Sequence, residues 1–119
     1  MSKRDPRVTL RQIADSARQA QAICADKTLS VLLSDWLALL AFERAMEILG
    51  EAVKRLPDDL RERYPAGQWK LIAGMRDRLS HGYDEIRHDV LWNAVRDDLP
   101  TLLDTVARMI EDLGNATAK

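Results

Sequence analysis

Apolar residues recur along this chain of 119 residues at intervals of three and four, which is the spacing of one face of an α-helix. A polar stretch that ends in Asp5 and Pro6 provides a helix entrance before the first apolar stripe. That stripe consists of Leu10, Ile13, Ala17, Ala20 and Cys24. The N-terminal part is therefore predicted to form one amphipathic helix with a buried face.

A long second helix is predicted from about residue 29 to residue 56, after a cap at Asp26 or Thr28. Its first half is apolar on nearly every side, which in a soluble protein indicates burial on more than one face. Polar residues, Asp35 and Glu43 among them, interrupt it within the ~20 residues that a membrane span needs. A central position in a bundle would account for this apolar surface, but we expect part of it to meet a second copy of the chain.

The middle of the chain is predicted to hold a short helix and then a longer one. The short helix follows Pro57 and runs to about Tyr64, and a turn at residues 65–67 leads into the longer helix, which begins at about Trp69. Trp69 heads an apolar face and is interpreted as a core or interface anchor in preference to a base-stacking platform. Gly82 is placed as the left-handed residue that ends this helix.

The last apolar stripe follows Asp89, its predicted cap, and ends at Gly114. Pro100 lies inside this stripe and is expected to kink the helix or split it in two. The chain has no strand-like alternation, internal repeat or low-complexity linker of note. The predicted fold class is therefore all-α, a four- to five-helix up-and-down bundle that forms a single domain over residues 1–119.

The charge balance limits the kinds of partner that the chain can bind. With 18 Lys and Arg residues against 19 Asp and Glu residues, the formal net charge is -1. The chain thus lacks the overall positive field of a general nucleic-acid binder, and any RNA contact must come from a local patch. Cys24 is the only cysteine, which excludes an internal disulfide and makes a reducing cytoplasm the simplest compartment. The polar N-terminus does not resemble a secretion signal.

Candidate chemistry is concentrated in residues 74–83, which contain Arg76, His81 and Tyr83. His81 is expected at the end of its helix, where the backbone carbonyls favour the protonated imidazole. Arg76 lies five residues earlier, about 140° round an ideal helix, so the two side chains do not share one face. They can still meet over one substrate, because arginine is long and the last turn is expected to unwind near His81.

These three residues spell R-x-x-x-x-H-x-Y, which resembles the signature of the HepT-like toxins of the HEPN superfamily. The surrounding blocks are similar in order and spacing and cover most of the chain: residues 43–52, 69–76, 90–92 and 98–100. The resemblance implies a metal-independent endoribonuclease, the toxin of a bacterial toxin-antitoxin pair, which forms a homodimer and uses no cofactor. It also implies a partner, a minimal nucleotidyltransferase antitoxin that attaches AMP groups to Tyr83.

The residue types suit this chemistry. RNA carries its own nucleophile, the 2′-hydroxyl, so a nuclease without a metal needs a proton-transfer group and a cation that stabilises the charged transition state. His81 would supply the first and Arg76 the second. AMP on Tyr83 would add negative charge and bulk two residues from His81, and so repel and obstruct RNA. Further contacts to the RNA backbone are expected from Lys70, Arg78 and Ser80.

An acidic stripe lies on the predicted second helix. Glu43, Glu47 and Glu51 repeat at intervals of four, and the ordinary interpretation of such a stripe is a solvated face. Alternatively, a carboxylate of this stripe, Glu43 or Glu51 among the candidates, orients Arg76 or His81. No histidine accompanies the stripe, so a metal site is not indicated.

Two other interpretations of the motif stay open. Arg76, His81 and Tyr83 can be structural residues at a capped helix end, or the chain can be a non-catalytic helical adaptor that presents substrate to a nucleotidyltransferase. The presence of all three residues favours the enzyme. The second histidine, His88, lies beside Asp89 in a predicted loop and is interpreted as a surface or capping residue.

Overall fold

The computed structural model describes residues 5–81 and 87–117, and every regular element in these two ranges is a helix, which confirms the all-α fold class. The elements in chain order are α1 (Pro6–Cys24), α2 (Leu29–Ser34), α3 (Trp36–Arg55), α4 (Asp58–Glu62), the 3₁₀ helix η1 (Pro65–Gly67), α5 (Trp69–His81), α6 (His88–Asp97) and α7 (Leu99–Thr117). None of the described helices has the length and apolar character that a membrane span requires.

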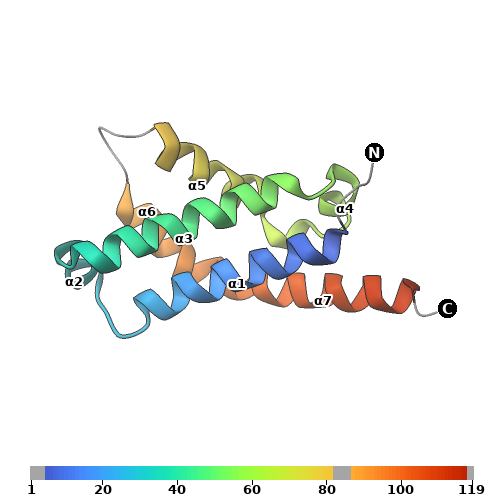
Figure 1. Cartoon of the computed structure of the whole chain (residues 1–119), viewed down its shortest axis with the longest axis horizontal. Helices are drawn as coiled ribbons and strands as arrows, with labels where there is room; N and C mark the ends of the chain where they lie inside the picture. Colours follow the sequence, from blue (N-terminus) through green and yellow to red (C-terminus); the bar gives the residue numbers. More distant parts are fainter. Residues whose placement is uncertain (1–4, 82–86, 118–119) are drawn as a thin grey trace.

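The long helices form an up-and-down bundle in which α3 lies between α1 and α5 and α7 packs against the other side of α1 (Figure 1). The short helix α6 packs mainly against α7. The first turn of α1 and the last turn of α7 lie at one end of the bundle, whereas α2 and the last turn of α5 lie at the opposite end (Figure 1). The end of the motif helix is thus remote from both terminal helix ends.

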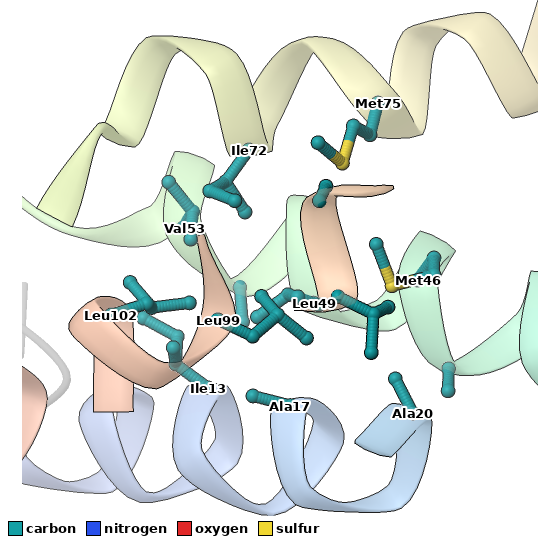
Figure 2. Close-up of a cluster of buried hydrophobic side chains, with 14 of the residues drawn as sticks. Ile13, Ala17, Ala20, Met46, Leu49, Val53, Ile72, Met75, Leu99 and Leu102 are labelled. Carbon is teal, nitrogen blue, oxygen red and sulfur yellow. The ribbon is translucent and has the colours of Figure 1, made fainter. Parts of the chain in front are cut away.

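Apolar side chains from four helices meet in the core, as Figure 2 shows. The labelled side chains are Ile13, Ala17 and Ala20 from α1, Met46, Leu49 and Val53 from α3, Ile72 and Met75 from α5, and Leu99 and Leu102 from α7. All ten are buried, and each large one contributes about 1.5–3 kcal/mol by leaving water. The predicted stripe on the first helix, from Leu10 to Cys24, is confirmed as part of this core.

The first two helices begin at capping side chains. Asp5 accepts a hydrogen bond from the backbone N–H of Arg7 at 2.9 Å, and Thr28 accepts one from that of Val31 at 3.2 Å. Of the two caps proposed for the second helix, the structure therefore has Thr28. Each cap satisfies a backbone donor that the first turn of a helix leaves without an intrahelical partner.

The prediction of one continuous helix over residues 29–56 is wrong. Asp35 has extended backbone angles, φ -103° and ψ 94°, and separates α2 from α3. Its side chain accepts a hydrogen bond from the N–H of Ala38 at 3.1 Å, so Asp35 is the N-cap of α3. The Asp35 side chain binds a backbone N–H of the next helix, and this hydrogen bond favours an extended conformation at Asp35 over continuation of the preceding helix. Because the residues around Asp35 are mostly apolar, the sequence pattern does not reveal the break.

The C-terminal elements agree with the prediction in part. Pro100 lies in the first turn of α7 just after α6 ends, which confirms the predicted split; proline is tolerated there because that turn needs no N–H donor. Asp89 is not the cap of this region, because the N-cap of α6 is Arg87 and the Asp89 carboxylate pairs with the Arg87 guanidinium at 2.9 Å. Gly114 does not end α7, which continues to Thr117.

Trp69 fixes the start of the motif helix. Its side chain is buried, and its indole N–H donates to the carbonyl oxygens of Tyr64 at 2.8 Å and Arg61 at 3.0 Å. Gly67 makes room for the ring, because a β-carbon at position 67 would fall 2.3 Å from a ring carbon of Trp69. The interpretation of Trp69 as a core anchor is confirmed. The predicted helix-ending residue Gly82 lies outside the described residues.

Candidate active site

The motif helix α5 packs along α3 through its apolar face, which includes Ile72, Met75 and the half-buried Leu79. Arg76 follows Met75 on the border of this face. The two helices pack closely at Gly50 of α3, where a β-carbon would fall 2.5 Å from the β-carbon of Arg76. The absence of a side chain at Gly50 thus sets the depth at which Arg76 lies against α3.

The guanidinium of Arg76 is only partly engaged by the protein. About a third of the side chain is exposed, 34%, and its Nη1 lies 3.8 Å from Oδ1 of Asp77, beyond hydrogen-bond distance. Its Nε is buried and has no hydrogen-bond partner within the described part of the chain. The exposed part of this guanidinium suits an anionic ligand that would accept its N–H groups.

A small pocket lies between α3 and the last turns of α5. Its volume is about 210 Å³, and it is lined by Leu40, Glu43, Arg44, Glu47 and Leu79. Arg44 and Glu47 form an ion pair in its wall. Since Leu79 lies two residues before His81, this pocket marks the part of α3 that the end of the motif helix faces.

The two glutamates proposed to support the motif have other partners. Glu43 Oε2 lies 2.6 Å from Nε2 of His88, the first residue of α6, and Glu51 Oε1 lies 2.7 Å from an Nη of Arg55. Within residues 5–81 and 87–117, neither carboxylate is hydrogen-bonded to Arg76. Glu43 nevertheless lies in the pocket beside the end of α5, whereas Glu51 pairs along the surface of α3.

Lys70 faces a different part of the surface from Arg76. It lines a groove of about 1110 Å³ between α5, the end of α3 and the α4–η1 segment. Lys54 and Asp77 also line this groove and form an ion pair between α3 and α5. Arg76 is not among its lining residues, so the structure does not bring Lys70 and Arg76 together.

His81 is the last residue of α5, as predicted. Several other features of the motif fall outside the part of the chain that the structure describes. The structure does not describe the side chains of Arg78, Ser80 and His81, and Tyr83 lies outside the described residues. The convergence of the Arg76 and His81 side chains on one substrate therefore stays a prediction. No three His, Cys, Asp or Glu side chains among the described residues are grouped so that they could hold a metal ion.

Two residues of this region were not identified from the sequence. Gly50 had no assigned role, since its effect depends on a contact with a helix that begins about twenty residues later. His88 was interpreted as a surface or capping residue, yet its side chain is only 21% exposed and pairs with Glu43, which is 45 residues away in sequence. The shared polarity of Glu43 and His88 was the only signal, and it does not identify a pair.

Comparisons with known proteins place the chain in a family. Residues 13–109 match the family model described as "Ribonuclease HepT-like". A Methanocaldococcus jannaschii protein named "Putative RNase MJ0127" is 33% identical over 113 residues, which cover 95% of this chain and 93% of that protein. A Thermococcus cleftensis protein named "Probable ribonuclease HepT" is 34% identical over 100 residues, which cover 84% of this chain and 91% of that protein.

A further relative, from Caldanaerobacter subterraneus subsp. tengcongensis, is named "Putative RNase TTE0752" and is 41% identical over 71 residues, which cover 60% of this chain and 63% of that protein. No solved structure matches the chain significantly. The family model spans α3 and α5, the helices to which Glu43, Arg76 and His81 belong. This chain belongs to the HepT-like ribonuclease family.

Proposed function

We propose that this protein is a metal-independent endoribonuclease that uses Arg76 and His81. The observation that carries the proposal is the state of Arg76, whose side chain is about a third exposed and whose buried Nε has no partner among the described groups. It belongs to the helix that His81 ends, in a chain of a ribonuclease family. An RNA phosphate would accept the donors that the protein leaves open.

The reaction needs only two proton transfers and one source of positive charge. The 2′-hydroxyl of RNA attacks the adjacent phosphorus, its proton passes to a base, and the bond to the 5′-oxygen breaks as that oxygen takes up a proton. His81 supplies or accepts a proton in this sequence, and Arg76 stabilises the additional negative charge on the phosphate oxygens. The products are a 2′,3′-cyclic phosphate end and a 5′-hydroxyl end.

A second copy of the chain would complete the site. Five large apolar side chains on α2 and the start of α3 are exposed, and we call them the apolar end patch: Val31, Leu33, Trp36, Leu37 and Leu40. They lie at the end of the bundle where α5 finishes (Figure 1). Because monomeric proteins seldom expose so many large apolar groups together, a homodimer through this patch is proposed. Such a dimer would bring the motifs of the two copies, and a local excess of positive charge, to one interface.

The biological role that we propose is that of a cytoplasmic toxin controlled by a nucleotidyltransferase antitoxin. AMP groups attached to Tyr83 would place phosphate charge two residues from His81. That charge would repel the RNA backbone and its bulk would obstruct the cleft, so modification would switch off cleavage without unfolding the protein.

The test uses the purified protein and RNA in the presence of EDTA. We expect the wild type to cut RNA and to leave cyclic phosphate ends, and His81→Ala and Arg76→Ala to lose cleavage. Arg55→Ala is the matched control, because Arg55 is a surface arginine of α3 that pairs with Glu51. Intact RNA with the wild type, or cleavage that survives both motif substitutions, would refute the proposal and favour the non-catalytic adaptor.

The regulatory part has its own measurement. Co-expression with a nucleotidyltransferase encoded beside this protein should add adenylate mass to the wild type and not to Tyr83→Phe. Unchanged mass of the wild type in the presence of an active transferase would contradict modification, while leaving the ribonuclease proposal intact.

A further inference from the structure

Two cations from neighbouring helices lie beside one carboxylate oxygen. Lys54, in the last turn of α3, forms an ion pair with Oδ1 of Asp77 on α5. Nη1 of Arg76 lies 3.8 Å from the same oxygen. Both cationic nitrogens are therefore within 4 Å of a single atom. Because Arg76 is the residue proposed to bind phosphate, Lys54 brings a second positive charge to the same place.

The packing of α3 against α5 accounts for this position of Lys54. Gly50 lies one helical turn before Lys54, and a β-carbon at Gly50 would fall 2.5 Å from the β-carbon of Arg76. Residues four apart in a helix lie on the same face, about 40° from each other. Lys54 therefore belongs to the face of α3 that meets α5. A close contact between two helix backbones thus determines how near the two cations are to each other.

The three charged side chains are accessible to a ligand. Lys54 is 38% exposed, Asp77 50% and Arg76 34%. Lys54 and Asp77 also line the groove of about 1110 Å³, so a ligand that enters the groove can reach them.

The charges around this point favour an anion. Two cations and one carboxylate leave one net positive charge at Arg76, in a chain whose formal net charge is -1. This excess depends on Lys54, since Arg76 and Asp77 alone would cancel. A phosphate group has several anionic oxygens, so it can bind two cations at once. The other charged residues that line the groove balance one another: Asp58, Arg61, Glu62 and Lys70.

We propose that Lys54 is a second phosphate-binding residue of the candidate active site, and that Lys54 and Arg76 bind the same RNA phosphate. The inference rests on the proposed ribonuclease function and adds a residue of α3 to a site that the motif places on α5. Asp77 has two opposite effects in this arrangement. It lies between the two cations, and its negative charge opposes the binding of RNA.

A purely structural role of the ion pair would give a different result. If Lys54 and Asp77 only joined α3 to α5, Lys54→Gln and Asp77→Asn would break the same contact and have similar effects. If Lys54 binds phosphate, the two substitutions change RNA affinity in opposite directions, because one removes a cation and the other an anion. An exposed ion pair contributes little to stability, so both variants should fold.

The experiment measures binding of a short single-stranded RNA that carries 2′-O-methyl groups and so lacks the nucleophile for cleavage. We expect Lys54→Gln to raise Kd by about three- to tenfold, as loss of one hydrogen-bonded contact does. Asp77→Asn should lower Kd, and Lys54→Arg should stay close to the wild type. The slope of log Kd against log salt concentration should fall by about 0.7 in Lys54→Gln, the value for one phosphate contact on a single strand.

Arg55→Gln is the matched control. Arg55 follows Lys54 in the last turn of α3, and its substitution removes the same charge from the chain. Its guanidinium pairs with Glu51 and lies 3.5 Å from Oε1 of Gln12 on α1, away from Arg76. The Kd and the salt slope of this variant should equal those of the wild type.

The outcomes separate the assignment of Lys54 from the proposed function. Unchanged Kd and salt slope in Lys54→Gln, or weaker binding in both Lys54→Gln and Asp77→Asn, overturns the assignment and leaves the ribonuclease function in place. A wild type that does not bind the methylated RNA overturns the assignment as well. A wild type that fails to cut unmodified RNA refutes the proposed function, and the role of Lys54 in that site with it.

Discussion

Gly50 of α3 lies against the backbone and the β-carbon of Arg76 of α5, so the arginine proposed to bind phosphate belongs to a close contact between the two helices. A β-carbon at position 50 would fall 2.5 Å from the β-carbon of Arg76 and 3.2 Å from its backbone nitrogen and from the carbonyl oxygen of Ile72. These atoms belong to a helix and to the base of a side chain, which cannot rotate away. Any residue larger than glycine must therefore move α5.

Gly50→Ala is expected to destabilise the protein by about 1–3 kcal/mol, as overpacking of a close contact does. It should also reduce RNA cleavage, because α5 carries Arg76 with it. Gly74→Ala is the control on the motif helix itself, where a β-carbon would meet nothing within 4 Å. That variant should gain up to about 1 kcal/mol from helix propensity. Urea unfolding measures both, and equal stabilities for the two variants would contradict the close approach.

Arg76→Lys should lose most cleavage although the positive charge remains. Lysine cannot present the planar fork of donors that binds two phosphate oxygens, so we expect a loss of about 10²–10³ in kcat, the range for removal of a transition-state donor. Arg55→Lys on α3 is the control and should keep full activity. A cleavage rate for Arg76→Lys close to that of the wild type would show that charge alone is needed at this position.

Leu37→Asp should weaken self-association. Leu37 is 64% exposed in the apolar end patch, and a carboxylate there would be desolvated in a dimer. Leu71→Asp is a suitable control, because Leu71 is an exposed leucine on α5 away from that patch. Sedimentation velocity over a range of concentrations measures the effect. A wild type that stays monomeric throughout would rule out the homodimer, and an equal effect of both variants would place the interface elsewhere.

Tyr64 should make the stability of the bundle fall at alkaline pH. Its hydroxyl donates to Asp112 of α7 at 2.6 Å, and this hydrogen bond, helped by burial, raises the pKa of Tyr64 above its ordinary value of 10.0. Since the folded protein holds this proton more tightly than the unfolded chain, the contribution is complete below pH 10 and is lost as pH rises through the raised pKa.

Tyr64→Phe tests this dependence. The variant should be less stable than the wild type by about 0.5–1 kcal/mol at neutral pH, the usual net value of one hydrogen bond. The difference between the two proteins should shrink as pH rises from 10 through the raised pKa of Tyr64. Urea unfolding at a series of pH values from neutral to strongly alkaline gives both quantities, and a constant difference would contradict the hydrogen bond to Asp112.

Helical periodicity predicted the bundle because the buried stripes dominate the pattern. The core residues from Leu10 to Cys24 and the split at Pro100 followed from spacing and from proline geometry. The helix boundaries that were predicted wrongly lie where a helical and a non-helical backbone conformation compete at one residue. Asp35 begins a new helix inside an apolar run, and Gly114 remains helical because one glycine costs only about 1 kcal/mol in a helix of 19 residues.

The candidate site was less accessible to sequence reasoning because its supporting contacts are tertiary. Arg76 and His81 could be selected from their chemistry and their place on one helix. Gly50 acts only through the approach of α5, and His88 only through Glu43 on another helix. Nothing in the local sequence of either residue distinguishes it from an ordinary helix glycine or a surface histidine, so both needed the structure.

The first turn of α1 and the last turn of α7 emerge together at the end of the bundle opposite the end of α5 (Figure 1). A purification tag, a fluorescent reporter or a whole additional domain attached before α1 or after α7 would therefore lie at the other end of the bundle from the last turn of α5, which His81 ends. Labels at either position are suited to following this protein in cells, because they leave the end of the motif helix unobstructed.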